Sequence, residues 1–227
     1  MVKRISLKRF LLVYSLSFSI PFLILFCLFN KEVLNESDIS QEQVKPRYSQ
    51  QGLVIEGSDA VMPVDRAMER VSKKPYGIYV SPNNSPVQPE RFSGYHTASD
   101  FEILADEEDL PVLVYAICEA ELKYQGIVNG YGGVMILACD LNGEAVTLIY
   151  GHLDIKQLDY QVGDKINKGD QIAILAPAYS DLSDGERKHL HLGIHRGEKI
   201  ELRGYVSSES ELLSWYDPML LLLEGAF

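Results

Sequence analysis

Residues 189–195 read HLHLGIH, and this stretch indicates the fold more clearly than any other part of the 227-residue chain. Apolar residues alternate there with histidine or glycine, which is the period of two that is typical of a β-strand. We therefore expect His189 and His191 to project side by side from one face of the strand. Two imidazoles on a rigid strand suit a metal site, because zinc takes nitrogen and oxygen ligands in a tetrahedral array.

Other short apolar runs surround this strand and are separated by turn residues such as those at 141–144. Runs with strand character cover residues 112–124, 133–141, 145–153 and 170–176. The 17 glycines and 13 tyrosines of the chain also favour β-structure over a helical bundle. Near the C-terminus, residues 208–223 predict a short helix that closes the domain. The sequence therefore predicts a mainly β domain.

The N-terminal region contains an apolar run at residues 10–29, which read FLLVYSLSFSIPFLILFCLF without a charge. At about 1.5 Å per residue, a helix of this length crosses a hydrocarbon layer of roughly 30 Å. No small-residue cleavage site follows it, which favours a retained transmembrane anchor over a cleaved signal peptide. Basic side chains stay on the cytoplasmic side of such a span. Four of them precede this one: Lys3, Arg4, Lys8 and Arg9. We expect a single-pass protein of the cell membrane with an extracytoplasmic domain.

The length of the chain allows one ordinary domain together with an anchor and a linker. Residues 1–29 form the basic stub and the anchor. Residues 30–74 are rich in Glu, Gln, Ser, Asp and Lys, and we interpret them as a polar linker with a short helix near 58–74. Residues 75–227 then form the folded domain.

Charge and cysteine content limit the partners and the chemistry. The formal net charge is −11. Binding to a phosphate backbone requires clustered Lys and Arg, so this charge argues against nucleic acid as a partner. Cys118 and Cys139 form no CxxC pair. We favour two buried free cysteines over a disulfide, which would form in an oxidising compartment if their strands were neighbours. The sequence does not decide the oligomeric state.

All five histidines lie between residues 96 and 195, and this confinement is the first indication of a site. His96 precedes Asp100 by four residues in GYHTASD, and His152 follows a strand-like run in LIYGHLD. A loop that carries His96 and Asp100 could supply further ligands to a metal held by the HLH stretch. We interpret His195 as a surface histidine that lies out of reach of the site.

The motifs HxxxD, YGHL and HLH, in this order, resemble those of the lysostaphin and LytM family of zinc endopeptidases. The resemblance covers roughly residues 76–220. It extends to GYGG at residues 130–133, where Tyr131 could line a cleft, and to VGDKINKGDQIA at residues 162–173, which resembles the family's hairpin. It implies a compact, mainly antiparallel β-sheet metallopeptidase domain with the metal in a groove over the sheet.

The resemblance also implies roles for individual residues. His96, Asp100 and His191 would be the metal ligands that bind Zn2+, and a water molecule would complete the coordination. Three protein ligands with an open fourth position separate a catalytic zinc from a structural one. His152 and His189 would stand beside the metal as the catalytic pair, with the choice of base left open. The implied substrate is the peptide part of peptidoglycan, and no residue specifies which bond is cleaved.

One residue departs from the family pattern, which usually has glycine two residues after the first histidine. Ala98 occupies that place here. If the backbone there requires a positive φ, alanine costs on the order of 1 kcal/mol relative to glycine.

Two other functions compete with hydrolysis. A catalytically silent relative would bind the bacterial cell wall or activate an amidase. However, none of the three metal ligands and neither of the two flanking histidines of the family pattern is missing from this chain. A membrane-fusion-type adaptor would combine an N-terminal span with a lipoyl-like hairpin at residues 162–173. Such an adaptor has no use for the histidine set, and the heptad-rich coiled coil that adaptors carry is absent from this sequence.

Overall fold

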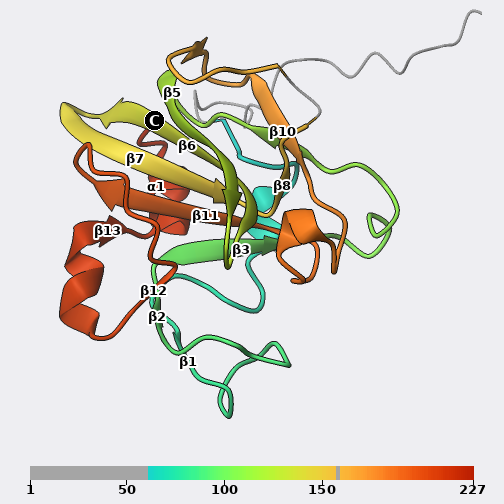
Figure 1. Cartoon of the computed structure of the whole chain (residues 1–227). Helices are drawn as coiled ribbons and strands as arrows, with labels where there is room; N and C mark the ends of the chain where they lie inside the picture. The colour runs from blue at the N-terminus through green and yellow to red at the C-terminus, as the bar shows by residue number, and fades with distance from the viewer. Residues whose placement is uncertain (1–60, 157–158) are drawn as a thin grey trace, which may run out of the picture. The chain divides into compact units, whose positions relative to one another are not determined.

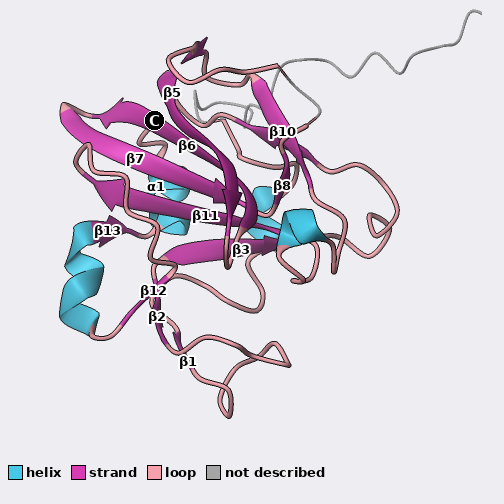
Figure 2. Cartoon of the chain, viewed as in Figure 1, coloured by secondary structure: helices cyan, strands magenta, loops and turns pink. Residues whose placement is uncertain are grey.

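Strands form most of the regular structure of this protein (Figure 2). The structure is a computed structural model, and it describes residues 61–156 and 159–227. All strand pairs among these residues are antiparallel. The predicted mainly β, antiparallel domain is therefore confirmed.

The predicted anchor at residues 10–29 and the linker up to residue 60 lie outside the described residues. Within the part of the chain that the structure describes, no helix has both the length and the apolar character that a membrane span requires.

A seven-stranded sheet has the order β13-β11-β7-β6-β5-β9, with β3 also paired to β11 (Figure 1). Its strands are β3 (Ala98–Glu102), β5 (Ala120–Val128), β6 (Gly132–Leu141), β7 (Glu144–Gly151), β9 (Lys165–Ile166), β11 (His189–Arg196) and β13 (Trp215–Tyr216). The predicted runs 133–141, 145–153 and 189–195 correspond to its central strands β6, β7 and β11. Asn142 and Gly143 join β6 to β7 with φ angles of 52° and 88°, as a tight hairpin turn requires.

Two three-stranded sheets have the orders β4-β10-β8 and β1-β2-β12. Their strands are β1 (Tyr79–Val80), β2 (Gly94–His96), β4 (Leu113–Tyr115), β8 (Leu153–Asp154), β10 (Gln171–Leu175) and β12 (Tyr205–Val206).

The predicted hairpin at residues 162–173 is wrong, because its two strands belong to different sheets. β9 pairs with β5, whereas β10 pairs with β4 and β8. Gly163 and Gly169 turn the chain at positive φ. They donate their N–H groups to the carbonyl oxygens of Leu122 and Ala116, at 2.8 Å each, and so direct the two strands to separate partners.

The predicted closing helix forms over only part of residues 208–223. The chain there contains the 3-10 helix η3 (Glu209–Ser214), strand β13 and the α-helix α1 (Pro218–Glu224). The helical stretch is interrupted because β13 pairs with the end of β11. Asp217 then caps α1 by accepting a hydrogen bond from the N–H of Met219 at 2.9 Å.

Side chains alternate between the two faces of the large sheet. On one face, buried apolar residues pack with α1, which lies behind β7 and β11 in Figure 1, and form the main core with Leu137, Leu148, Leu192, Leu221 and Leu222. On the other face a smaller cluster is formed by Val134, Ile136, Ile149 and Trp215. Because Leu190 and Leu192 face the main core, His189 and His191 project from the opposite face.

Residues 61–74, which the sequence analysis assigns to the linker, pack against the rest of the described chain. Val64 and Ala67 belong to the main core, and the only helical structure in this stretch is the 3-10 turn η1 (Ala67–Glu69). Arg70 is 1% exposed and forms a 2.5 Å ion pair with Glu107. These contacts tie the segment to the sheet that carries the histidines.

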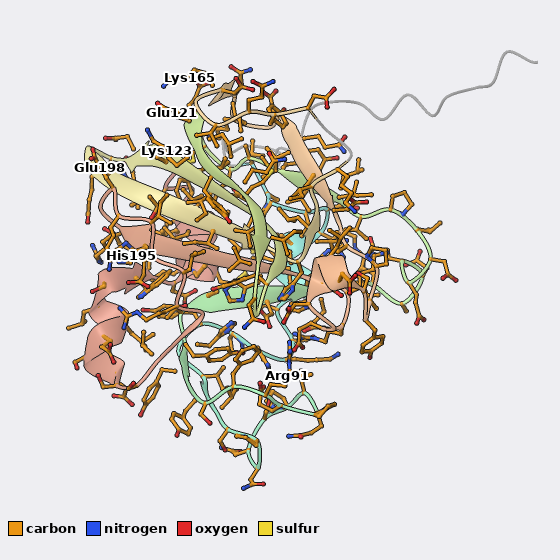
Figure 3. All side chains as sticks on the ribbon, viewed as in Figure 1. Arg91, Glu121, Lys123, Lys165, His195 and Glu198 are labelled. Atoms are coloured by element: carbon orange, nitrogen blue, oxygen red, sulfur yellow. A yellow bond between two sulfur atoms is a disulfide. The ribbon has the colours of Figure 1, made fainter. Side chains whose placement is uncertain are left out.

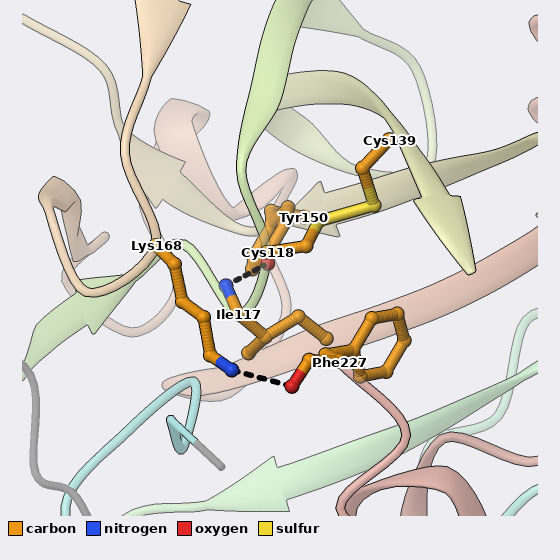
Figure 4. The surroundings of a disulfide bond; sticks show 6 residues. All are labelled: Ile117, Cys118, Cys139, Tyr150, Lys168 and Phe227. Carbon is orange, nitrogen blue, oxygen red and sulfur yellow. Dashed lines mark hydrogen bonds between the residues drawn. A yellow bond between two sulfur atoms is a disulfide. The ribbon is translucent and has the colours of Figure 1, made fainter. Parts of the chain in front are cut away.

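Cys118 and Cys139 form a disulfide (Figure 4), which corrects the expectation of two free cysteines. Their Cα atoms are 6.4 Å apart, and 21 positions separate them in the sequence. Cys118 comes just before β5, and Cys139 lies in β6 opposite Ala120. Pairing of β5 with β6 therefore brings the two sulfur atoms together.

Candidate metal centre and active site

Strand β11 organises the site because it pairs with both β3 and β7. The register places His191 opposite Asp100 of β3 and opposite Gly151 of β7. Directly opposed residues of an antiparallel pair have Cβ atoms roughly 5 Å apart, so the register alone brings His191 beside Asp100. Gly151 leaves space for the ring of Tyr131 beside His191, since a Cβ atom there would lie 2.6 Å from that ring.

His96 completes a group of three side chains that could hold a metal ion. It is the last residue of β2, and Thr97 alone separates β2 from β3. Nε2 of His96 lies 3.3 Å from Nδ1 of His191 and 3.4 Å from Oδ1 of Asp100. Nδ1 of His191 lies 3.2 Å from the same oxygen. All three residues are buried, and one ligand atom from each falls within 4.8 Å of the others. The three predicted ligands are therefore together.

Backbone carbonyl groups hold His96 through its side chain and Asp100 through its backbone. Nδ1 of His96 lies 3.3 Å from the carbonyl oxygen of Pro75, and the N–H of Asp100 donates to the carbonyl oxygen of Lys74 at 3.0 Å. A carbonyl oxygen only accepts hydrogen bonds, so Nδ1 of His96 carries the proton. Its Nε2 then presents a lone pair towards Asp100 and His191, as a metal ligand requires.

His152 and His189 lie together at one side of this group, with ring centroids 4.3 Å apart. Nδ1 of His152 lies 3.1 Å from the carbonyl oxygen of Ser183, and Nδ1 of His189 lies 2.8 Å from that of Arg187. His152 follows the last residue of β7 and has a φ of 61°, in the left-handed region that few non-glycine residues adopt. Nε2 of His189 lies 3.3 Å from Oδ2 of Asp100, so the predicted catalytic pair is close to the three candidate ligands.

Burial dominates the electrostatics of the site. It lowers the pKa of His96 to about 3, although the Asp100 carboxylate acts in the opposite direction. Burial also lowers the pKa of His191, and it lowers that of His152 well below the usual range. Burial alone would raise the pKa of Asp100, but its interactions with His189 and His96 leave that pKa well below the ordinary value. Neutral imidazoles and an ionised carboxylate are the forms that bind a metal.

A pocket of about 300 Å³ opens beside the ligand group. Tyr131, which the sequence analysis names as a residue that could line a cleft, lines this pocket, and its ring centroid lies 5.0 Å from that of His191. Gly204 forms part of the wall. A Cβ atom at Gly204 would lie 2.9 Å from the Tyr131 hydroxyl and 3.5 Å from Cε1 of His191, so glycine keeps the pocket open there.

Sequence reasoning missed three side chains that border the site. The ring of Tyr205 stacks on that of His96 with centroids 5.1 Å apart, and its hydroxyl accepts a hydrogen bond from Nζ of Lys74 at 3.2 Å. Nη2 of Arg187 donates to Oδ2 of Asp100 at 2.9 Å. No motif marks these residues, because their contacts join positions up to 131 residues apart.

The interpretation of His195 as a surface residue is wrong. His195, which is labelled in Figure 3, is 8% exposed. Its ring packs against that of Trp215 with centroids 4.9 Å apart. The reason is the pairing of β13 with β11, which places Trp215 opposite His195.

Ala98 lies fully buried in β3, opposite Gly193 of β11. Its backbone is that of an extended strand, and it is not one of the non-glycine residues with positive φ. The departure from the family pattern at this position therefore introduces no left-handed backbone strain.

The model of Peptidase family M23 matches residues 94–202, a range that contains all five predicted site residues. Similar solved structures include lysostaphin from Staphylococcus simulans, with 21% identity and a TM-score of 0.45 over 72% of this chain and 54% of that chain. LytU has 22% identity and a TM-score of 0.41 over 75% and 88%. The complex of SpoIIIAH and SpoIIQ has 16% identity and a TM-score of 0.46 over 72% and 99%. No curated protein matches the sequence.

Proposed function

Residues 94–202 belong to peptidase family M23, and from this we propose that the protein is a zinc-dependent endopeptidase that hydrolyses peptide bonds in peptidoglycan. The observation that carries the proposal is the buried group of His96, Asp100 and His191, with His152 and His189 beside it. This combination supplies both a metal site and groups that can move protons.

The donor set fits zinc. Two imidazole nitrogens and one carboxylate oxygen are ligands that zinc prefers, and three protein ligands leave the fourth position open, as in catalytic sites. The carbonyl group of Pro75 already holds His96 in the tautomer that ligation needs. When bound there, zinc would lower the pKa of a coordinated water towards about 7 and polarise a substrate carbonyl group.

Hydrogen bonding supports different roles for the two remaining histidines. His152 donates from Nδ1 to Ser183, which leaves a lone pair on Nε2. His189 has an acceptor at each nitrogen, with the Arg187 carbonyl oxygen 2.8 Å from Nδ1 and Oδ2 of Asp100 3.3 Å from Nε2.

We assign His152 as the base that accepts the proton of the attacking water and returns it to the leaving amine. We assign His189, which lies beside His152, to stabilisation of the negative charge on the attacked carbonyl oxygen. The two side chains thus divide proton transfer from charge stabilisation.

We further propose that the protein is anchored in the cell membrane by residues 10–29 and acts outside the cytoplasm. The basic residues before this run support that orientation. The disulfide between Cys118 and Cys139 also fits an oxidising compartment. The adaptor alternative loses its main motif, because β9 and β10 do not form a hairpin.

The direct test uses the full chain, loaded with zinc and incubated with purified peptidoglycan sacculi. We expect peptides with new amine termini, identified by mass, and we expect a chelator to abolish their release. Absence of new termini from zinc-loaded protein would refute hydrolysis and favour the wall-binding alternative.

Two variants separate metal binding from proton transfer. His191→Ala removes a ligand, so we expect loss of both zinc and turnover. His152→Asn keeps a residue that tolerates the left-handed backbone, so we expect retained zinc and turnover reduced by roughly 10²–10⁴-fold. Normal turnover by the His152→Asn protein would show that the assignment of the base is wrong.

A further inference from the structure

Arg187 is not one of the three proposed metal ligands, but its side chain contacts one of them, Asp100. Arg187 lies two residues before His189, and its side chain is 12% exposed. We propose that Arg187 is a positioning residue that holds Asp100 in the orientation needed for metal binding. The inference rests on the proposed metal site, and it concerns a residue that none of the three motifs contains.

The two carboxylate oxygens of Asp100 face different partners. Oδ1 faces the candidate metal position, 3.4 Å from Nε2 of His96 and 3.2 Å from Nδ1 of His191. Oδ2 accepts a hydrogen bond from Nη2 of Arg187 at 2.9 Å and also lies 3.3 Å from Nε2 of His189. A carboxylate that is fixed through one oxygen cannot rotate freely about its Cβ–Cγ bond. The contact with Arg187 therefore keeps Oδ1 directed at the candidate metal position.

Arg187 is itself held in place by a second carboxylate. Nε of Arg187 donates to both oxygens of Glu102, at 3.0 and 2.9 Å. Glu102 lies two residues after Asp100 in β3, so both carboxylates project from the same face of the strand. A planar guanidinium with several donors can bridge two such groups, whereas the point charge of a lysine cannot reproduce this geometry.

The backbone of Arg187 orients a second member of the site. Its carbonyl oxygen accepts the hydrogen bond from Nδ1 of His189 at 2.8 Å. The side chain and the carbonyl group of one residue thus hold both a proposed ligand and a proposed catalytic histidine. Groups that orient a metal ligand in this way affect metal affinity by roughly 10–100-fold.

The test compares zinc affinity, measured by competition with a chelator, in the full chain and its Arg187→Gln variant. We expect the zinc dissociation constant of the variant to rise by roughly 10–100-fold. Arg187→Lys should recover only part of this loss, because lysine can contact one carboxylate at a time. An unchanged dissociation constant in Arg187→Gln protein would overturn the proposal while leaving the proposed metal site intact. Absence of zinc binding by the unmodified chain would overturn both.

A matched control distinguishes positioning from a general structural role. Arg91, which is labelled in Figure 3, forms ion pairs with the carboxylates of Asp184 and Glu186 at 3.0 and 2.8 Å, and neither of these is a proposed ligand. We expect Arg91→Gln to leave zinc affinity unchanged, even if it alters the unfolding temperature of the metal-free protein. An equal loss of zinc affinity in the Arg91→Gln and Arg187→Gln proteins would count against the proposal.

A double variant tests whether Glu102 acts through Arg187. Glu102→Gln should weaken zinc binding less than Arg187→Gln, and the combination should be no weaker than Arg187→Gln alone. Strictly additive losses would show that the two residues do not act as one unit. Tighter zinc binding in Arg187→Gln, reversed by Glu102→Gln, would overturn the positioning role, because Arg187 would then be shielding Glu102 from the metal.

Discussion

The disulfide between Cys118 and Cys139 gives a stability prediction that can be worked from the fold. The bond closes a loop of about 22 residues, since the two cysteines are 21 positions apart. In the chain-entropy description, a loop of this length stabilises the folded state by about 3 kcal/mol at 25 °C. We therefore expect replacement of both cysteines by alanine to reduce the free energy of unfolding by about that amount, a large fraction of the stability of an ordinary domain.

Urea unfolding can be followed by the fluorescence of Trp215, the single tryptophan of the chain, which is 3% exposed. For an m-value near 2 kcal/mol/M, the midpoint should fall by about 1.5 M. All samples carry Cys27→Ala, so that no other thiol can pair, and all contain a chelator, because bound metal stabilises by mass action.

Reduced protein with the cysteines intact is the control that separates the bond from the packing of the sulfur atoms. Its midpoint should match that of the alanine variant. Equal midpoints for the oxidised and reduced proteins would refute the argument. Zinc affinity should not change, because the disulfide is far from the site. Val134 of β6 lies next to the site, and Cys139 is five residues further along the same strand, a distance of roughly 17 Å.

Two further predictions concern the pH dependence of stability and the shape of the pocket. Because burial lowers the pKa of His96 from 6.5 to about 3, the unfolded chain binds more protons than the folded one between those values. The stability of the metal-free protein should therefore decline as the pH falls below about 6.5, by roughly 1 kcal/mol between pH 6 and pH 5 from this residue alone; urea midpoints that do not change over this range would contradict it. Gly204→Ala should reduce turnover of sacculi at least tenfold with the fold retained, because the new methyl group would meet Tyr131. Gly143→Ala, in an open turn with a φ of 88°, should instead cost about 1 kcal/mol of stability and leave turnover unchanged. Normal peptide release by the Gly204→Ala protein, or reduced release by the Gly143→Ala protein, would count against these two predictions.

The parts of the fold that sequence reasoning predicted are those with a local signal. The strands β6, β7 and β11 each show continuous apolar or alternating character, and the turn between β6 and β7 carries an Asn-Gly pair. The five proposed site residues could be named from the sequence because their motifs are short and distinctive, and the structure brings them together. Once β11 is in register with β3, His191 must lie beside Asp100.

The parts that were missed depend on contacts between distant segments. Residues 208–223 have the composition of a helix, but two of them pair with β11 and interrupt it. The same pairing buries His195, which the sequence analysis interprets as a surface histidine out of reach of the site. Lys74 and Tyr205 come together across 131 positions, and no pattern within a short window can reveal such a contact.

The support for the proposed ligands extends beyond the stretch that matches family M23. A fragment cut at residues 94 and 202 would lose the carbonyl groups of Lys74 and Pro75, and thereby the acceptors for Asp100 and His96. Each buried donor left without a partner costs roughly 1–3 kcal/mol. We therefore expect a recombinant fragment of residues 94–202 to retain metal poorly, because it lacks these two carbonyl groups. An inactive result from such a piece would say nothing about the chemistry of the intact polypeptide.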